Sequence, residues 1–199
     1  PVAEKRGQVI LKDIHKDYLD FLLKFKGDYS DIKIAFDLSN GMSSLYAREI
    51  FGDEPAYIFE ELDGNFPNHE PNPLIPKNVE PLQALVKKTG ADVGVIYDGD
   101  ADRVMFVDNE GKFVSPDLMI AVLGHYFIDE RHETGTVLQD IRSSKAVGEY
   151  LTPMGCKMAT WKVGRAFAAK KLRELDGVWG GELAGHYYFR DFFYSDSGL

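Results

Sequence analysis

Three aspartates alternate with small residues near the middle of this 199-residue chain, in the segment Asp98-Gly99-Asp100-Ala101-Asp102-Arg103. The apolar runs on either side, residues 93–97 and 104–107, have the composition of buried strands. Carboxylates this close together raise one another's pKa and destabilise a fold that gives them no partner. We therefore expect an α/β protein with a ligand site at the carboxyl end of a strand.

Three interpretations of this acidic loop are open. An EF-hand calcium loop needs Gly at its sixth position and Glu at its twelfth, where this chain has Arg103 and Asn109, and the flanking strands also argue against it. A solvated acidic turn without a ligand is disfavoured because apolar strands lie on both sides. The third interpretation is a Mg²⁺ site that keeps part of its coordination sphere for phosphate or water. Arg103 favours it, since a planar guanidinium beside a metal suits a phosphate group.

Composition limits the partners and the compartment. The net charge of −9 argues against nucleic acid and against an anionic membrane surface as partners. Cys156 is the single cysteine, so an internal disulfide is excluded and we expect a reducing, cytoplasmic location. We expect neither a membrane span nor a signal peptide. Because the chain does not begin with Met, we expect a piece of a longer protein.

Helical and strand patterns alternate along the chain. Asp13 is expected to cap the first helix, and Pro81 to lie in the first turn of the third. The order predicts two consecutive α/β/α domains with mixed, mostly parallel sheets, residues 1–111 and 112–199. The predicted helices cover residues 14–25, 43–51, 79–88, 116–128, 145–151 and 165–175, and the predicted strands cover 32–36, 57–59, 93–97, 104–107, 136–138, 157–161 and 187–189.

A second candidate segment is Gly181-Glu182-Leu183-Ala184-Gly185-His186. Its glycines let the backbone approach a ligand closely. Glu182 and His186 supply an acceptor and a titratable donor, which suits sugar hydroxyls or proton transfer. The alternative is a Gly-rich turn with a surface Glu and a packed His. Among the basic residues, Arg165 at a predicted helix start is the one we expect near a phosphate, and His69 lies in a Pro- and Asn-rich loop that is a further candidate lining.

These segments together carry a family resemblance. The acidic loop resembles the metal-binding loop of the α-D-phosphohexomutases, the phosphoglucomutase/phosphomannomutase family, and residues 181–186 resemble its sugar-binding loop, usually G-E-x-S-G-H. Residues 64–69 and 161–164 also resemble family segments, so the similarity covers nearly the whole chain. Members have four domains, and the resemblance places this chain on the second and third. It implies that the N- and C-terminal domains of the same polypeptide are partners.

The resemblance also implies a reaction, the interconversion of hexose 1-phosphate and 6-phosphate by an isomerase of carbohydrate metabolism. A phosphoserine in the first domain phosphorylates the hexose phosphate, and the bisphosphate intermediate turns over and returns its other phosphate. Mg²⁺ would be held by Asp98, Asp100 and Asp102 with a phosphoserine oxygen. Arg103 would contact phosphate. Glu182 and His186 would bind the sugar, and His186 would also move a proton.

Some features depart from the family pattern. The nucleophile motif, T-x-S-H-N-P or close to it, is absent from the sequence, so we expect the isolated chain to be inactive. Ala184 stands where Ser is usual, Arg165 where many members have His, and Arg142 where some have Lys. Arg142 and Arg165 keep positive charge for substrate phosphate.

Two other functions are alternatives. One is a metal-dependent phosphatase with Asp98 as nucleophile. It is disfavoured because the motif of such phosphatases has a hydroxyl residue two places after its second Asp, where this chain has Asp102. The other is a non-catalytic module that binds sugar phosphates.

Overall fold

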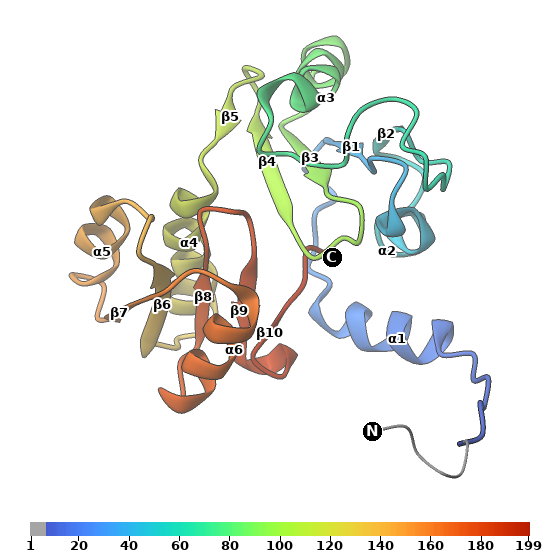
Figure 1. The fold of residues 1–199 in the computed structure, drawn as a ribbon. Helices are drawn as coiled ribbons and strands as arrows, with labels where there is room; N and C mark the ends of the chain where they lie inside the picture. Colours follow the sequence, from blue (N-terminus) through green and yellow to red (C-terminus); the bar gives the residue numbers. More distant parts are fainter. Residues whose placement is uncertain (1–6) are drawn as a thin grey trace.

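The computed structural model describes residues 7–199, in which two five-stranded sheets lie side by side (Figure 1). In the first sheet, β1 (Ile34–Asp37) lies between β2 (Ala56–Ile58) and β3 (Val93–Tyr97), and both neighbours are parallel to it. The sheet continues with the antiparallel strands β4 (Val104–Asp108) and β5 (Phe113–Val114). The β3–β4 pair places the acidic loop at the carboxyl end of β3.

The second sheet repeats this plan. In it, β6 (Thr136–Asp140) lies between the edge strand β7 (Lys157–Trp161) and β8 (Trp179–Gly181), and both neighbours are again parallel to it. The antiparallel strands β9 (Tyr187–Phe189) and β10 (Ser195–Asp196) complete it. The predicted fold class, two α/β/α domains with mixed sheets, is therefore confirmed, with the parallel pairs on one side of each sheet and the antiparallel pairs on the other.

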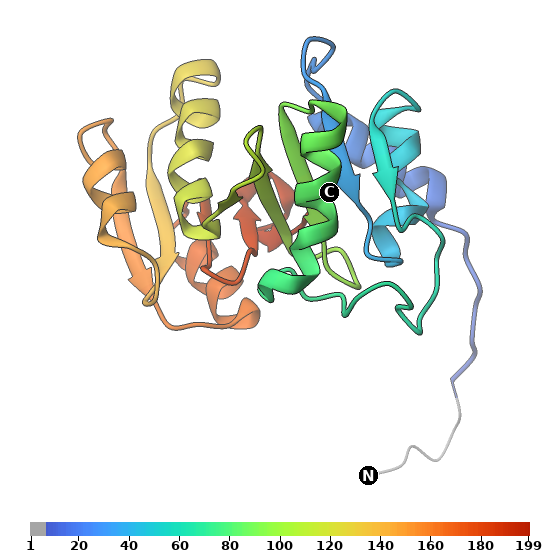
Figure 2. The ribbon, with the colours of Figure 1, turned by 90° about the horizontal axis from the view of Figure 1, so that it is seen from above.

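Helices cover both sheets (Figure 2). Across the first sheet, α3 (Pro76–Thr89) buries Val79, Leu82 and Val86 against β1, β3 and β4. In the second domain, α4 (Pro116–His125) contacts β8 and α5 (Lys145–Leu151) contacts β7. The helix α6 (Arg165–Glu174) packs through Leu172 in a cluster with Leu138. No helix in residues 7–199 is long and apolar enough to cross a membrane. The helices are α1 (His15–Leu22), α2 (Ala47–Phe51), α3 (Pro76–Thr89), α4 (Pro116–His125), α5 (Lys145–Leu151) and α6 (Arg165–Glu174), with 3-10 turns η1 (Leu23–Phe25), η2 (Met42–Leu45) and η4 (Arg190–Phe192) and the π-helical turn η3 (Tyr126–Glu130).

One apolar cluster joins the two domains. It contains Phe36 and Tyr97 from the first sheet and Trp179 from the second. Trp179 is fully buried, stacks on Phe127 with ring centroids 4.7 Å apart, and donates its indole N–H to the Ile120 carbonyl at 3.0 Å. Burial of rings of this size contributes strongly to stability. The shared cluster holds the two domains against each other, and so fixes the position of the loops between them.

Several predicted element bounds were wrong. α3 begins at Pro76, which occupies the first helical position, where a missing N–H costs nothing, so Pro81 lies inside the helix and not in its first turn. The predicted helix over 43–51 is a 3-10 turn followed by the shorter α2. Asp13 accepts from the His15 backbone N–H at 2.9 Å, although Ile14 is the N-cap residue.

The strand β8 was also missed, because its Gly180 and Gly181 read as a loop. The structure shows why glycine is needed there. A Cβ on Gly180 would lie 2.8 Å from the Leu138 carbonyl oxygen, and one on Gly181 would lie 2.7 Å from the Ile120 side chain. Real Cβ atoms do not come this close to a neighbour, so this strand reaches its place only because positions 180 and 181 carry no side chain.

Replacing Gly185 with Ala should destabilise the fold more than replacing Gly90 with Ala. Both glycines have positive φ, +90° and +66°, which costs an Ala about 1–2 kcal/mol. A Cβ on Gly185 would also lie 2.7 Å from the fully buried Met105, whereas nothing lies within 4 Å of one on Gly90. We expect this overpacking to cost about 1–3 kcal/mol more. Urea unfolding of both variants measures it, and equal losses would contradict the tight contact at Gly185.

Candidate functional site

The acidic loop is a tight connection between β3 and β4, pressed against the turn that follows β1. Its ends are joined by the Asp98 N–H, which donates to the Arg103 carbonyl at 3.3 Å. The Met42 N–H donates to the Gly99 carbonyl at 3.0 Å, and a Cβ on Gly41 would lie only 2.7 Å from that same oxygen. The close approach of the β1 turn therefore fixes the backbone of the acidic loop, and it requires glycine at position 41.

The three aspartates of this loop point toward one another. Asp98, Asp100 and Asp102 each offer a carboxylate oxygen, and these oxygens lie within 4.8 Å of one another. Asp98 is buried and accepts from the Arg103 Nε at 2.6 Å and from the Arg103 backbone N–H at 3.2 Å. Burial raises the pKa of Asp98 above its ordinary value, while the hydrogen bonds and charge of Arg103 act to lower it. A cluster of oxygen donors with one buried member suits a hard divalent cation.

The second candidate segment connects β8 to β9 as a turn, with the Glu182 N–H and the His186 carbonyl paired at 2.9 Å. Glu182 is buried. Its Oε1 accepts from the Tyr188 hydroxyl at 2.8 Å and from the Gly164 N–H at 3.3 Å, and its Oε2 lies 3.7 Å from the Arg142 guanidinium. Burial, followed by the bond to Glu182, raises the pKa of Tyr188. Oε2 is therefore the Glu182 oxygen with acceptor capacity left for a ligand.

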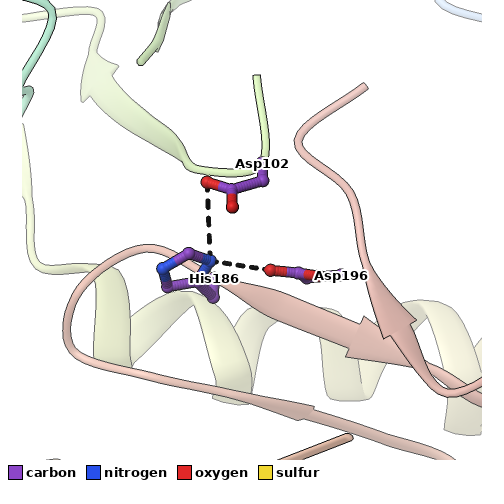
Figure 3. A group of neighbouring side chains, drawn as sticks. All are labelled: Asp102, His186 and Asp196. Carbon is purple, nitrogen blue, oxygen red and sulfur yellow. Dashed lines mark hydrogen bonds and ion pairs between the residues drawn. The ribbon is translucent and has the colours of Figure 1, made fainter. Parts of the chain in front are cut away.

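The two loops meet across the domain junction. The Val104 N–H donates to the Gly185 carbonyl at 3.1 Å, and Arg103 and His186 form an isolated antiparallel β-bridge. Figure 3 shows both carboxylates beside the same ring nitrogen of His186, with Nδ1 3.7 Å from Asp102 Oδ1 and 2.8 Å from Asp196 Oδ2. The structure thus brings the predicted metal-binding residues and the predicted sugar-binding His186 into one place.

The two arginines predicted to bind substrate phosphate each pair with an acid at the site. Arg142 donates through Nε and Nη2 to Asp140 Oδ2, at 3.1 and 2.6 Å. Arg165, at the start of α6, donates to Asp102 Oδ2 at 2.7 Å across the domain junction and lies 3.7 Å from Asp196. Their side chains are 42% and 57% exposed, so a part of each guanidinium faces solvent and is open to an anion.

Sequence reasoning missed three residues of this site. Asp196 and Asp140 are both buried. Asp196 hydrogen-bonds to His186, and Asp140 accepts from Arg142. The Tyr188 hydroxyl donates to Glu182. A usable signal existed for Asp140 alone, because an aspartate at the end of an apolar strand marks a sheet edge. His69, a further candidate, is 7% exposed and hydrogen-bonds to Asp37 at the end of β1, so it anchors its loop to the sheet.

Known proteins are similar to this chain over nearly its whole length. The family described as "Phosphoglucomutase/phosphomannomutase, alpha/beta/alpha domain II" matches residues 16–111, and the corresponding domain III matches residues 115–199. A phosphoglucomutase from Neisseria gonorrhoeae is 31% identical over 201 residues, which cover 99% of this chain and 44% of that protein. A phosphomannomutase from Escherichia coli is 33% identical over 211 residues, which cover 100% of this chain and 46% of that protein.

A solved structure shows the same fold. The crystal structure of a phosphoglucomutase/phosphomannomutase family protein from Burkholderia thailandensis superposes with a TM-score of 0.82 at 29% identity, covering 94% of this chain and 41% of that one. The chain therefore spans about half the length of the curated relatives it matches, and those relatives contain further domains.

Replacing Arg165 with Gln should tighten Mg²⁺ binding. The guanidinium pairs with Asp102, so a cation at the three aspartates competes with it for that carboxylate. An ion pair this exposed contributes about 0.2–1 kcal/mol, so its removal should raise the Mg²⁺ affinity roughly 1.5- to 5-fold. Titration calorimetry on the 199-residue chain measures this.

Arg173→Gln is the matched control, since it removes the same charge from the same helix but donates to the Phe193 carbonyl, away from the acidic loop. Equal tightening in both variants would mean that the effect is net charge alone. Unchanged or weaker affinity in Arg165→Gln would contradict the competition.

Proposed function

Because this chain belongs to the phosphoglucomutase/phosphomannomutase family, we propose that it supplies the metal-binding and sugar-binding loops of an enzyme that interconverts hexose 1-phosphate and hexose 6-phosphate. The reaction proposed is the family's, through a phosphoserine enzyme and a bisphosphate intermediate. The serine and the remaining domains are proposed to lie on other parts of the same polypeptide. In this view residues 1–111 are the metal-binding domain and residues 112–199 the sugar-binding domain.

The observation that carries this proposal is the junction of the two loops. Asp102 belongs to the first domain and His186 to the second, yet Asp102 Oδ1 and His186 Nδ1 lie 3.7 Å apart. A sugar phosphate needs both kinds of group at once, cationic or metal-bound contacts for its phosphate and hydrogen-bonding contacts for its hydroxyls. Either loop alone offers one kind, and together they offer both.

The acidic loop fits Mg²⁺ by its donor set. Three carboxylates offer oxygen alone, which suits a hard cation, and Arg103 offsets the charge of only one of them. We propose Asp98, Asp100 and Asp102 as the ligands. Mg²⁺ bound there would offset negative charge that builds up on the transferred phosphoryl group.

The chain's own residues divide the remaining work. Arg103 uses its Nε for Asp98 and keeps other N–H groups for a phosphate near the metal. Arg142 and Arg165 present exposed guanidinium edges for the substrate phosphate. Glu182 accepts a sugar hydroxyl through Oε2, and His186 contacts the sugar and moves the hydroxyl proton.

The phosphatase alternative finds no support at Asp98. Both of its carboxylate oxygens accept hydrogen bonds from Arg103, and its side chain is 3% exposed. A nucleophilic carboxylate must have an oxygen free to reach phosphorus. We therefore propose Asp98 as a ligand rather than as a nucleophile.

Two substitutions in the intact four-domain enzyme test the division of labour. Glu182→Gln should lower kcat/KM for hexose phosphates about ten- to a hundredfold, because a lost charged hydrogen bond costs about 1.5–3 kcal/mol. It should leave the slow hydrolysis of the phosphoserine by water unchanged, since that reaction involves no sugar. Asp100→Asn should depress both reactions.

Glu174→Gln, on the exposed face of α6 next to Lys170 and Lys171, is the control and should change neither reaction. The isolated 199-residue chain should show no turnover of glucose 1-phosphate with Mg²⁺ and a bisphosphate activator. The proposed roles would be wrong if Glu182→Gln slowed phosphoserine hydrolysis as much as sugar turnover. They would also be wrong if the isolated chain converted glucose 1-phosphate.

A further inference from the structure

Gly99, which separates the first two aspartates of the acidic loop, is held from two sides. On one side is the turn after β1, residues 37–42, where the Met42 N–H donates to the Gly99 carbonyl at 3.0 Å. On the other side is the segment 63–73 between β2 and α3, which passes beside the acidic loop (Figure 2). A Cβ on Gly99 would lie 3.3 Å from the Phe66 ring of that segment. The turn and the segment therefore form a clamp on Gly99.

Two side-chain contacts join the two sides of this clamp. His69 Nε2 lies 3.1 Å from Asp37 Oδ2, and both side chains are buried, at 7% and 0% exposure. The Asn68 side-chain amide donates to Asn40 Oδ1 at 2.8 Å. A buried carboxylate that loses a partner is costly, so the contact between His69 and Asp37 is the stronger of the two.

The turn after β1 has a backbone conformation that needs this support. Ser39 and Asn40 both have positive φ, 51° and 53°, although neither is glycine. Such a backbone persists only where its surroundings hold it, and it is found most often at functional sites. The Ser39 hydroxyl donates to the Tyr97 carbonyl at 2.6 Å, directly before Asp98 in the chain. The turn therefore also holds the backbone at the first aspartate.

We propose that His69 is a positioning residue for the acidic loop, which keeps the three aspartates at the spacing of a Mg²⁺ site and so disfavours Ca²⁺. This inference rests on the proposed function, in which Asp98, Asp100 and Asp102 hold the metal. Mg²⁺ needs near-octahedral oxygens at about 2.0–2.1 Å, whereas Ca²⁺ accepts more oxygens at about 2.3–2.6 Å in a flexible site. Selection between the two ions therefore depends on how rigidly the loop is held, and the clamp supplies that rigidity.

The test is the ratio of Mg²⁺ to Ca²⁺ affinity of the 199-residue chain, measured by titration calorimetry. His69→Ala should weaken Mg²⁺ binding about tenfold, the lower end of the effect of groups that support the ligands of a metal. Ca²⁺ binding should change less, so that the ratio falls. Asn68→Ala removes the other contact at an exposed position, so it spares the fold and should lower the ratio by a smaller factor. His125→Ala is the matched control, since it removes an imidazole that pairs with Asp129 in the second domain, and it should leave the ratio unchanged.

The clamp is also tested without metal, by hydrogen exchange of the Met42 N–H. We expect this N–H to exchange faster in His69→Ala, while the amides of β6 in the second domain keep their rates. An unchanged affinity ratio, an unchanged Met42 rate, or equally faster exchange in β6 would overturn the proposal. If the wild-type chain bound no Mg²⁺, the proposed metal site would fail, and the selectivity with it. A failure of the clamp alone would leave wild-type Mg²⁺ binding intact and the ratio unchanged in His69→Ala.

Discussion

The backbone contact between Val104 and Gly185 is the interaction on which the candidate site depends. It joins the strand after the acidic loop to the turn after β8, and the neighbouring Arg103 and His186 pair across the same junction. Gly185 adopts φ +90° with Met105 packed against it, so this approach is closed to residues with a Cβ. Because the contact is made by backbone, it fixes how far the carboxylates of one domain lie from the ring of the other.

Charge pairing follows from that placement. Each arginine of the site pairs with an aspartate: Arg103 with Asp98, Arg142 with Asp140, and Arg165 with Asp102. The arginines orient the carboxylates and the carboxylates hold the arginines before any ligand arrives. Charges arranged in this way before a ligand arrives would favour recognition of the proposed charged substrate.

Local patterns predicted much of this protein, and long-range pairing accounts for what they missed. β3, α5, β7 and β9 have the predicted bounds, because each is a distinct apolar or periodic run. The acidic loop was found because its three aspartates are close in sequence. The Arg165–Asp102 pair joins residues 63 positions apart, and Asp196 reaches His186 only through the two-residue strand β10. β8 was not predicted, because its glycines are required by tight packing and have low strand propensity.

The claim that the two loops form one site is tested most directly by Mn²⁺ titration of the 199-residue chain, followed by NMR. Mn²⁺ accepts the same carboxylate ligands as Mg²⁺ and broadens the amide signals of residues close to it. We predict selective broadening at residues 98–103 and also at Gly185 and His186 of the other domain, while Gly90 stays sharp. Broadening confined to the first domain, or unchanged when Asp98, Asp100 and Asp102 are replaced by Asn, would contradict the account.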